Sequence, residues 1–161
     1  MKLRYKILLI LCIVFLLNFI ENRVKSVSLN NVYDDIEKIA QEDDKETSWS
    51  KAIFEQSDGK TGEFHLKYSD FSGDETFWAL TSKENASITF NCESTVNSGN
   101  FKVVLVKPDK EIQNILEGTN QGNETIKLTA GEYKLKIVGR NTSGDVKFSI
   151  TESKNVTFKR S

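Results

Sequence analysis

Apolar and polar residues alternate in a series of short segments from Trp49 to the C-terminus. A period of two with one polar side predicts strands that pack on one face and contact water on the other. Phe101–Val106 is apolar on both faces and predicts a central strand, and Lys110–Leu116 fits a strand better than a helical turn. The alternating segments are Phe64–Tyr68, Ile88–Cys92, Ile126–Leu128, Tyr133–Ile137 and Val146–Ile150.

Turn-forming residues separate these segments at intervals of roughly 8–12 residues, which is typical of all-β folds. We therefore predict an all-β domain over residues 49–161, an antiparallel β-sandwich of jelly-roll type with about eight or nine strands. The turn formers, each expected to reverse the chain, are Ser57–Gly59, Ser72–Asp74, Asn97–Asn100, Gly118–Gly122 and Asn141–Gly144.

The N-terminus has a different pattern, in which the basic residues Lys2, Arg4 and Lys6 precede an apolar run. The run extends from Ile7 to Ile20 and is interrupted by Asn18. This is the pattern of an export signal or a membrane anchor, with the basic end on the cytoplasmic side. A membrane-spanning helix needs about 20 apolar residues, so the length favours a cleaved signal peptide over residues 1–26. An anchor formed by residues 7–20 remains the alternative, and either predicts a secreted or cell-surface protein.

Residues 27–48 predict a short helix and a linker. Val32, Ile36 and Ile39 form a helical stripe, with Asn31 as a plausible N-cap. The acidic stretch Gln41–Ser48 contains no apolar residue, so we expect a solvated linker. Calcium is the one cofactor that these acids suggest, but their spacing fits no EF-hand and lacks its turn glycine. We therefore predict no cofactor and no metal site.

Composition excludes two classes of protein. The net charge is −1, with 22 basic and 23 acidic residues, so the chain has no electrostatic footprint for nucleic acid. Cys12 lies in the apolar run and Cys92 is alone after it, which excludes a disulfide-stapled scaffold. We expect Cys92 to be a small buried residue.

The residues that could support catalysis are few. His65 is the single histidine, and it falls on the polar side of a predicted strand. No nucleophile-elbow glycine pattern accompanies any serine, and one histidine without a cysteine cluster does not supply enough ligands for zinc. We therefore predict that the protein is not an enzyme and has no catalytic residue. A glycosidase is the weaker alternative, and its candidate acids are Glu63, Asp70, Asp74 and Glu75.

Aromatic residues give the one indication of a ligand. Phe77 and Trp78 are adjacent, so in a regular strand they face opposite sides and one of them is exposed. An exposed ring can stack on a sugar, and Phe77, Trp78 and Tyr68 are therefore the candidate ligand-binding residues. In the alternative interpretation Trp78 fills the core, and Phe77 packs under Trp49 or under the Val32–Ile39 helix.

The region from Phe77 to Ile150 resembles the bacterial pre-peptidase C-terminal type of β-sandwich. The likeness rests on Val104–Asp109, Thr125–Ile137 and Gly144–Ile150, and its best single match is the turn Ala130–Tyr133. The resemblance implies a secreted accessory module. The family often carries acids leading into the strand where this chain has Gly99–Val103, so it does not imply a calcium site here.

Two functions remain open at this point. The first is an exported, non-catalytic binding module at the cell surface, with a surface glycan or the cell wall as its ligand. The alternative is a membrane-anchored structural subunit that binds an extracellular protein through the Val32–Ile39 helix and has no glycan ligand. An edge strand near Val156–Phe158 could support self-association.

Overall fold

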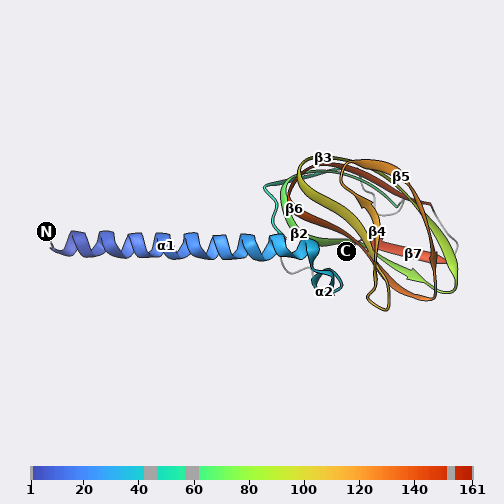
Figure 1. Ribbon diagram of the computed structural model, residues 1–161, viewed down its shortest axis with the longest axis horizontal. Coiled ribbons are helices and arrows are strands. Elements are labelled where there is room, and N and C mark those ends of the chain that lie inside the picture. Colours follow the sequence, from blue (N-terminus) through green and yellow to red (C-terminus); the bar gives the residue numbers. More distant parts are fainter. Residues whose placement is uncertain (1, 42–46, 57–61, 152–154, 161) are drawn as a thin grey trace.

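A computed structural model describes residues 2–41, 47–56, 62–151 and 155–160 (Figure 1). The predicted turn at residues 57–59 and most of the predicted acidic linker lie outside this part of the chain. The helical elements are α1 (Lys2–Asn31), the 3-10 helix η1 (Val32–Asp34) and α2 (Ile36–Ile39). The strands are β1 (Lys51–Gln56), β2 (Glu63–Ser82), β3 (Ala86–Val106), β4 (Ile112–Glu117), β5 (Asn120–Leu128), β6 (Gly131–Thr151) and β7 (Val156–Arg160).

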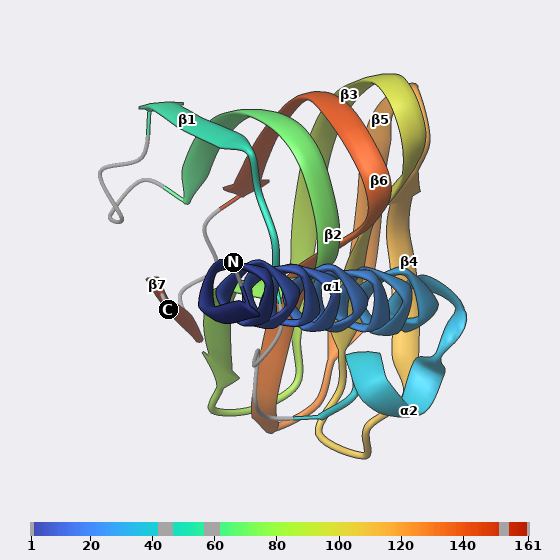
Figure 2. The ribbon, with the colours of Figure 1, turned by 90° about the vertical axis from the view of Figure 1, so that its left-hand side faces the viewer.

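The strands form one antiparallel sheet that folds over on itself. Its order is β1-β2-β6-β3-β4, with β5 paired to β3 and β7 paired to β2. β2, β3 and β6 are 20 to 21 residues long, and each runs through both layers of the fold. Figure 2, which looks along α1, shows these three strands as curved ribbons. The predicted all-β antiparallel sandwich is therefore confirmed. Every predicted strand segment lies within a strand except Lys110–Leu116, whose strand β4 begins only at Ile112.

The three long strands bend at the same level of the sheet. The register of β2 shifts near Phe71, and that of β3 shifts between Val96 and Asn100. Asp70, Gly73, Gly99 and Asn141 have positive φ angles at these bends. Gly99 is required there, because a Cβ at this position would lie 2.6 Å from the Asn141 carbonyl carbon.

The bends correct the prediction of three chain reversals. Ser72–Asp74, Asn97–Asn100 and Asn141–Gly144 carry turn-forming residues, but each bends a strand that continues in the other layer. The described chain therefore has seven strands, three of them long, in place of the predicted eight or nine shorter ones. The predicted reversal at Gly118–Gly122 is present: the chain turns at residues 118–119, between β4 and β5, and the rest of the segment is the start of β5.

Each layer contains one half of every long strand. Layer 1 consists of β1, the first half of β2, the second half of β6, the first half of β3, and β5. Layer 2 consists of β7, the second half of β2, the first half of β6, the second half of β3, and β4. The hydrophobic core lies between them, where Trp78 of layer 2 packs against Phe64 and Phe148 of layer 1.

The segment after α1 covers the outer face of layer 2. Val32, Tyr33 and Ile39 are buried there against Val104, Val106 and Val138. The predicted helix is thus a 3-10 turn followed by a four-residue helix, and Ile36 of the predicted stripe is 64% exposed. Asn31 makes no side-chain cap, whereas the Asp35 carboxylate accepts a hydrogen bond from the Lys38 amide.

Helix α1 projects from the sandwich as a long straight arm (Figure 1). Its apolar side chains between Ile7 and Ile20 are exposed wherever they are described, and burial begins at Leu29. Across the portion that the structure describes, no helix combines the length and the apolar character needed to cross a membrane.

Candidate binding site

The three aromatic residues predicted to bind a ligand lie in the core. Tyr68, Phe77 and Trp78 are 3%, 4% and 0% exposed, so they form no platform on the surface. Phe77 faces the same side as Trp78 because the register shifts between Thr76 and Trp78. Such a bulge sets two residues of one strand opposite a single partner residue and breaks the alternation of faces.

Trp78 does fill the core, as the alternative interpretation proposed, but Phe77 packs elsewhere than under Trp49. The Phe77 ring stacks on Phe64 at 4.0 Å between centroids. Trp49 stacks instead on Phe71, also at 4.0 Å, and its indole nitrogen donates to Glu75. The aromatic cluster therefore packs the core, and Tyr68, Phe77 and Trp78 present no exposed ring.

The outer face of layer 1 carries two rows of polar side chains from four strands. The register places Asn123, Asn91, Ser149 and Glu63 side by side across β5, β3, β6 and β2. Two residues along each strand, it places Gln121, Glu93, Lys147 and His65 in a second row. Strands lie about 4.8 Å apart, so each row extends over roughly 14 Å, and the rows are about 7 Å apart.

These two rows line a shallow groove of about 670 Å³. We call it the polar groove and define it by the eight side chains of the two rows. Phe64, Cys92, Gly122 and Phe148 lie between the two rows along their strands and also line the groove. Cys92 and Phe148 pair with a neighbouring strand on both sides, so a ligand in the groove would be recognised mainly by side chains.

Hydrogen bonds and ion pairs hold part of the groove in place. Asn91 donates to the Ser149 hydroxyl at 3.2 Å, and Lys147 pairs with Glu93 at 3.3 Å. His65 Nε2 lies 2.7 Å from an oxygen of Asp145, which is next to the groove. The predicted exposed histidine is thus a partly buried member of this face.

The polar groove is lined by amides, carboxylates, a hydroxyl, an ammonium, an imidazole and a thiol. Cys92 is its one thiol, and burial, with a smaller effect from Glu124, raises the thiol pKa from 9.0 to about 12. A protonated thiol is a poor nucleophile. Among the residues that the structure describes, no cluster of three or more His, Cys, Asp or Glu could hold a metal ion.

The sequence pattern indicated the polar faces of these strands but could not identify the site. Its alternation places Glu63, His65, Lys147 and Ser149 on the wet sides of two predicted strands. Gln121 and Asn123 gave no signal, because they fall in a stretch expected to be a turn and its surroundings. The register between strands distant in sequence brings the two rows together, and periodicity alone does not contain it.

No protein-family model and no curated protein sequence matches the chain. Among solved structures, a family 35 carbohydrate-binding module from an environmental isolate is 14% identical, with a TM-score of 0.35 over 71% of this chain and 83% of that module. A family 35 module from Cellvibrio japonicus is 11% identical, with a TM-score of 0.38 over 73% and 83%. The pre-peptidase C-terminal domain of a collagenase from Bacillus anthracis is 12% identical, with a TM-score of 0.35 over 48% and 85%. The resemblance drawn from residues 77–150 thus has a counterpart among solved structures, and nothing about ligand or activity follows from it.

Proposed function

We propose that the protein is an exported, non-catalytic binding module that uses the polar groove to bind a surface glycan. The observation that carries this proposal is the presence of two polar side-chain rows on the open outer face of layer 1. The outer face of layer 2 is covered by Val32, Tyr33 and Ile39. The face of layer 1 that carries the two rows is not covered by these residues.

The chemistry of the groove fits a ligand rich in hydroxyl groups. Amides such as Asn123 and Gln121 both donate and accept hydrogen bonds, as hydroxyl groups do. The acids Glu63 and Glu93 are balanced in part by Lys147, so the groove carries no strong field for a highly charged ligand. A typical neutral hydrogen bond contributes about 0.5–1.5 kcal/mol net, so several weak contacts along an extended ligand are needed.

Helix α1 supports the location that we propose. Its apolar run Ile7–Ile20 follows a basic N-terminus, and the described apolar side chains of this run are exposed to solvent. Burying such a surface in lipid is favourable. We propose that α1 directs export and holds the protein at the membrane, with the sandwich on the outer side of the cell.

A co-sedimentation assay tests the glycan proposal. The full chain in mild detergent is mixed with peptidoglycan or insoluble polysaccharides, with calcium and with chelator. We expect saturable pelleting with at least one polymer, weakened about tenfold by Gln121→Ala combined with Asn123→Ala, which corresponds to about 1.4 kcal/mol. Asn114→Ala is the matched control, because Asn114 is an exposed asparagine on β4 in the other layer.

Two outcomes contradict the proposal. Pelleting that the groove variants leave unchanged would mean that the glycan binds elsewhere. If the protein pelleted with none of the polymers, a glycan ligand would be excluded. That result would favour the alternative, an anchored subunit with a protein partner. The partner would then have to bind a surface other than the predicted Val32–Ile39 helix, because Val32 and Ile39 are already buried against layer 2.

A further inference from the structure

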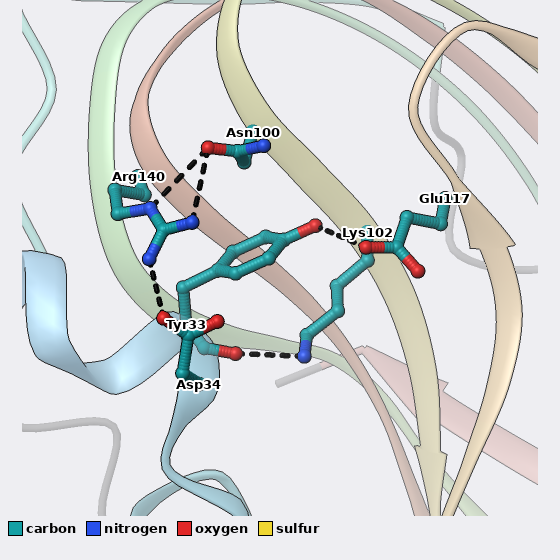
Figure 3. A network of polar contacts seen from close by, with 6 residues as sticks. All are labelled: Tyr33, Asp34, Asn100, Lys102, Glu117 and Arg140. Atoms are coloured by element: carbon teal, nitrogen blue, oxygen red, sulfur yellow. Dashed lines mark hydrogen bonds and ion pairs between the residues drawn. The ribbon is translucent and has the colours of Figure 1, made fainter.

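Residues 29–41 connect α1 to the sandwich, and we call them the neck. Tyr33 is the centre of this segment and is 4% exposed. Its ring lies between two cations, with the Lys102 ammonium 4.5 Å and the Arg140 guanidinium 4.9 Å from the ring centroid. Its hydroxyl donates to Glu117 at 2.8 Å. Figure 3 shows how residues from β3, β4 and β6 surround the ring.

The same cations also hold the neck backbone and its acid. Lys102 Nζ donates to the Tyr33 carbonyl oxygen at 2.7 Å, and Arg140 pairs with the Asp34 carboxylate. Arg140 also donates twice to the Asn100 side-chain oxygen, at 3.2 and 3.3 Å (Figure 3). The guanidinium therefore has fixed partners on both the neck and the sheet, which restricts movement of one against the other.

The far end of the neck is held by a buried ion pair. Lys136 is fully buried, pairs with Asp74 at 2.8 Å and donates to the Gln41 carbonyl oxygen at 3.0 Å. Ile39 is also fully buried. The contacts of Tyr33, Ile39 and Gln41 thus fix the neck at three places along its length.

Helix α1 enters this segment without a break. It is continuous to Asn31, and η1 begins at the next residue, Val32. Leu29 is 2% exposed, and the Asn30 side-chain oxygen accepts a hydrogen bond from Ser72 at 2.9 Å. The Ser72 hydroxyl in turn accepts from the Asn141 amide at 2.9 Å. The last turn of α1 is therefore bonded to the bends of β2 and β6.

The acidic stretch does not lie between the helix and the sandwich. Gln41, its first residue, is bonded to Lys136, and Ser48, its last, exchanges two backbone hydrogen bonds with Ser72 at 2.9 and 3.1 Å. Both flanks of residues 42–46 are thus attached to the sandwich. The stretch cannot act as the spacer between α1 and the domain, because the chain has already docked before reaching it.

We infer that the neck is a rigid joint that fixes the direction of α1 relative to the sandwich. The joint stands on the contacts of Tyr33, Arg140 and Lys136 and does not depend on the proposed function. What the joint implies for the orientation of the sandwich does rest on the proposed function. If α1 is held in a membrane, the joint makes the polar groove face one direction relative to the membrane surface. Leu29 is nine positions after Ile20, so the helix holds the sandwich roughly 14 Å beyond the apolar run.

A distance measurement between two spin labels tests the joint on the full chain in detergent micelles. Val24 and Lys127 are exposed, and each is replaced by cysteine in a Cys12→Ser background. Cys92 is kept, since its buried thiol resists labelling. We expect a single narrow distance distribution, which broadens in Tyr33→Ala and in Arg140→Ala. Lys147→Ala removes an exposed cation from the other face and should leave the distribution narrow.

The result separates the joint from other sources of rigidity. If Tyr33→Ala loses its cooperative unfolding transition, the decision rests on Arg140→Ala, whose side chain is partly exposed. A broad distribution in the parent chain would overturn the inference, and so would a distribution that stays narrow in the folded neck variants. The glycan assay does not enter this measurement, so the proposed function and the joint can fail independently.

Discussion

The Phe71 ring packs against the bare backbone of Gly139, where β2 and β6 bend together. A Cβ on Gly139 would lie 2.7 Å from Phe71 Cε1 and 2.8 Å from Thr142 Cγ2. Phe71 is fully buried and stacks on Trp49, so it has little room to move. We expect Gly139→Ala to lower the free energy of unfolding by about 1–3 kcal/mol, measured by chemical denaturation.

The control for this steric prediction is Gly122→Ala. A Cβ on Gly122 would meet no atom within 4 Å, and its φ is not positive. Its free energy of unfolding should change by less than about 0.5 kcal/mol. Equal midpoints for the Gly139 and Gly122 variants would show that the bend tolerates a side chain.

The second prediction concerns the buried pair of Lys136 and Asp74, which are 0% and 6% exposed. Lys136→Met removes the cation and leaves the Asp74 charge and the Gln41 carbonyl without this partner. We expect a loss of about 3–5 kcal/mol, because the desolvated carboxylate is no longer compensated. Adding Asp74→Asn should restore part of the loss. The exposed pair of Lys147 and Glu93 is the control, where Lys147→Met should cost at most about 1 kcal/mol.

The third prediction is a loss of stability at alkaline pH. Burial first, and Glu124 second, raises the pKa of Cys92 from 9.0 to about 12. The folded chain holds this proton more tightly than the unfolded chain, so the stabilisation is complete below pH 9 and is lost as the pH rises toward 12. Denaturation midpoints at pH 8 to 11 should therefore fall.

Cys92→Ala tests whether the Cys92 thiol causes the fall of the denaturation midpoint with pH. In this variant the denaturation midpoint should fall less steeply with pH. Part of the fall should remain, because burial also raises the pKa of Tyr33 and Tyr68. In the native chain at pH 8, a thiol reagent should modify Cys12 and spare Cys92 until the protein unfolds. Rapid modification of Cys92 in the folded state would contradict its burial.

The fourth prediction concerns the membrane. Leu11 and Leu16 are 60% and 57% exposed on α1. Replacing both by glutamate should move the protein from the membrane fraction to the supernatant, since charges within an apolar segment are costly in lipid. Val27→Glu, outside the apolar run but equally exposed at 59%, should leave the distribution unchanged. A parent chain found in the supernatant without residues 1–26 would identify a cleaved signal in place of an anchor.

The alternation of apolar and polar residues predicted the strands well, because a strand that is buried on one face has an apolar residue at every second position. Leu66, Ile137 and Val146 are fully buried at positions that alternation assigns to the core. The bends could not be foreseen from composition, because glycine and asparagine supply positive φ equally to a reversal and to a strand that continues. Gly99 and Asn141 have this role here, and only the partner strands decide between the two outcomes.

The exposed aromatic ring predicted at Phe77 or Trp78 is absent for a related reason. A regular strand would have exposed Phe77 or Trp78, but one bulge moved both into the core. Conversely, Asn91 and Asn123 are directly opposite each other only because β3 pairs with β5 across about thirty residues of intervening chain. Single-strand periodicity describes neither of these relationships.

Because β2, β3 and β6 run through both layers, the two layers cannot separate without breaking the same three strands. Opening one layer frees one half of each long strand, and the other half of the same strand forms the second layer. Amides in the two halves of each long strand should therefore exchange with solvent at similar rates, as one cooperative unit. A mechanical load applied through α1 would enter at the bends, where all three strands are already joined, and the sandwich would resist it as a single body until it unfolds as a whole.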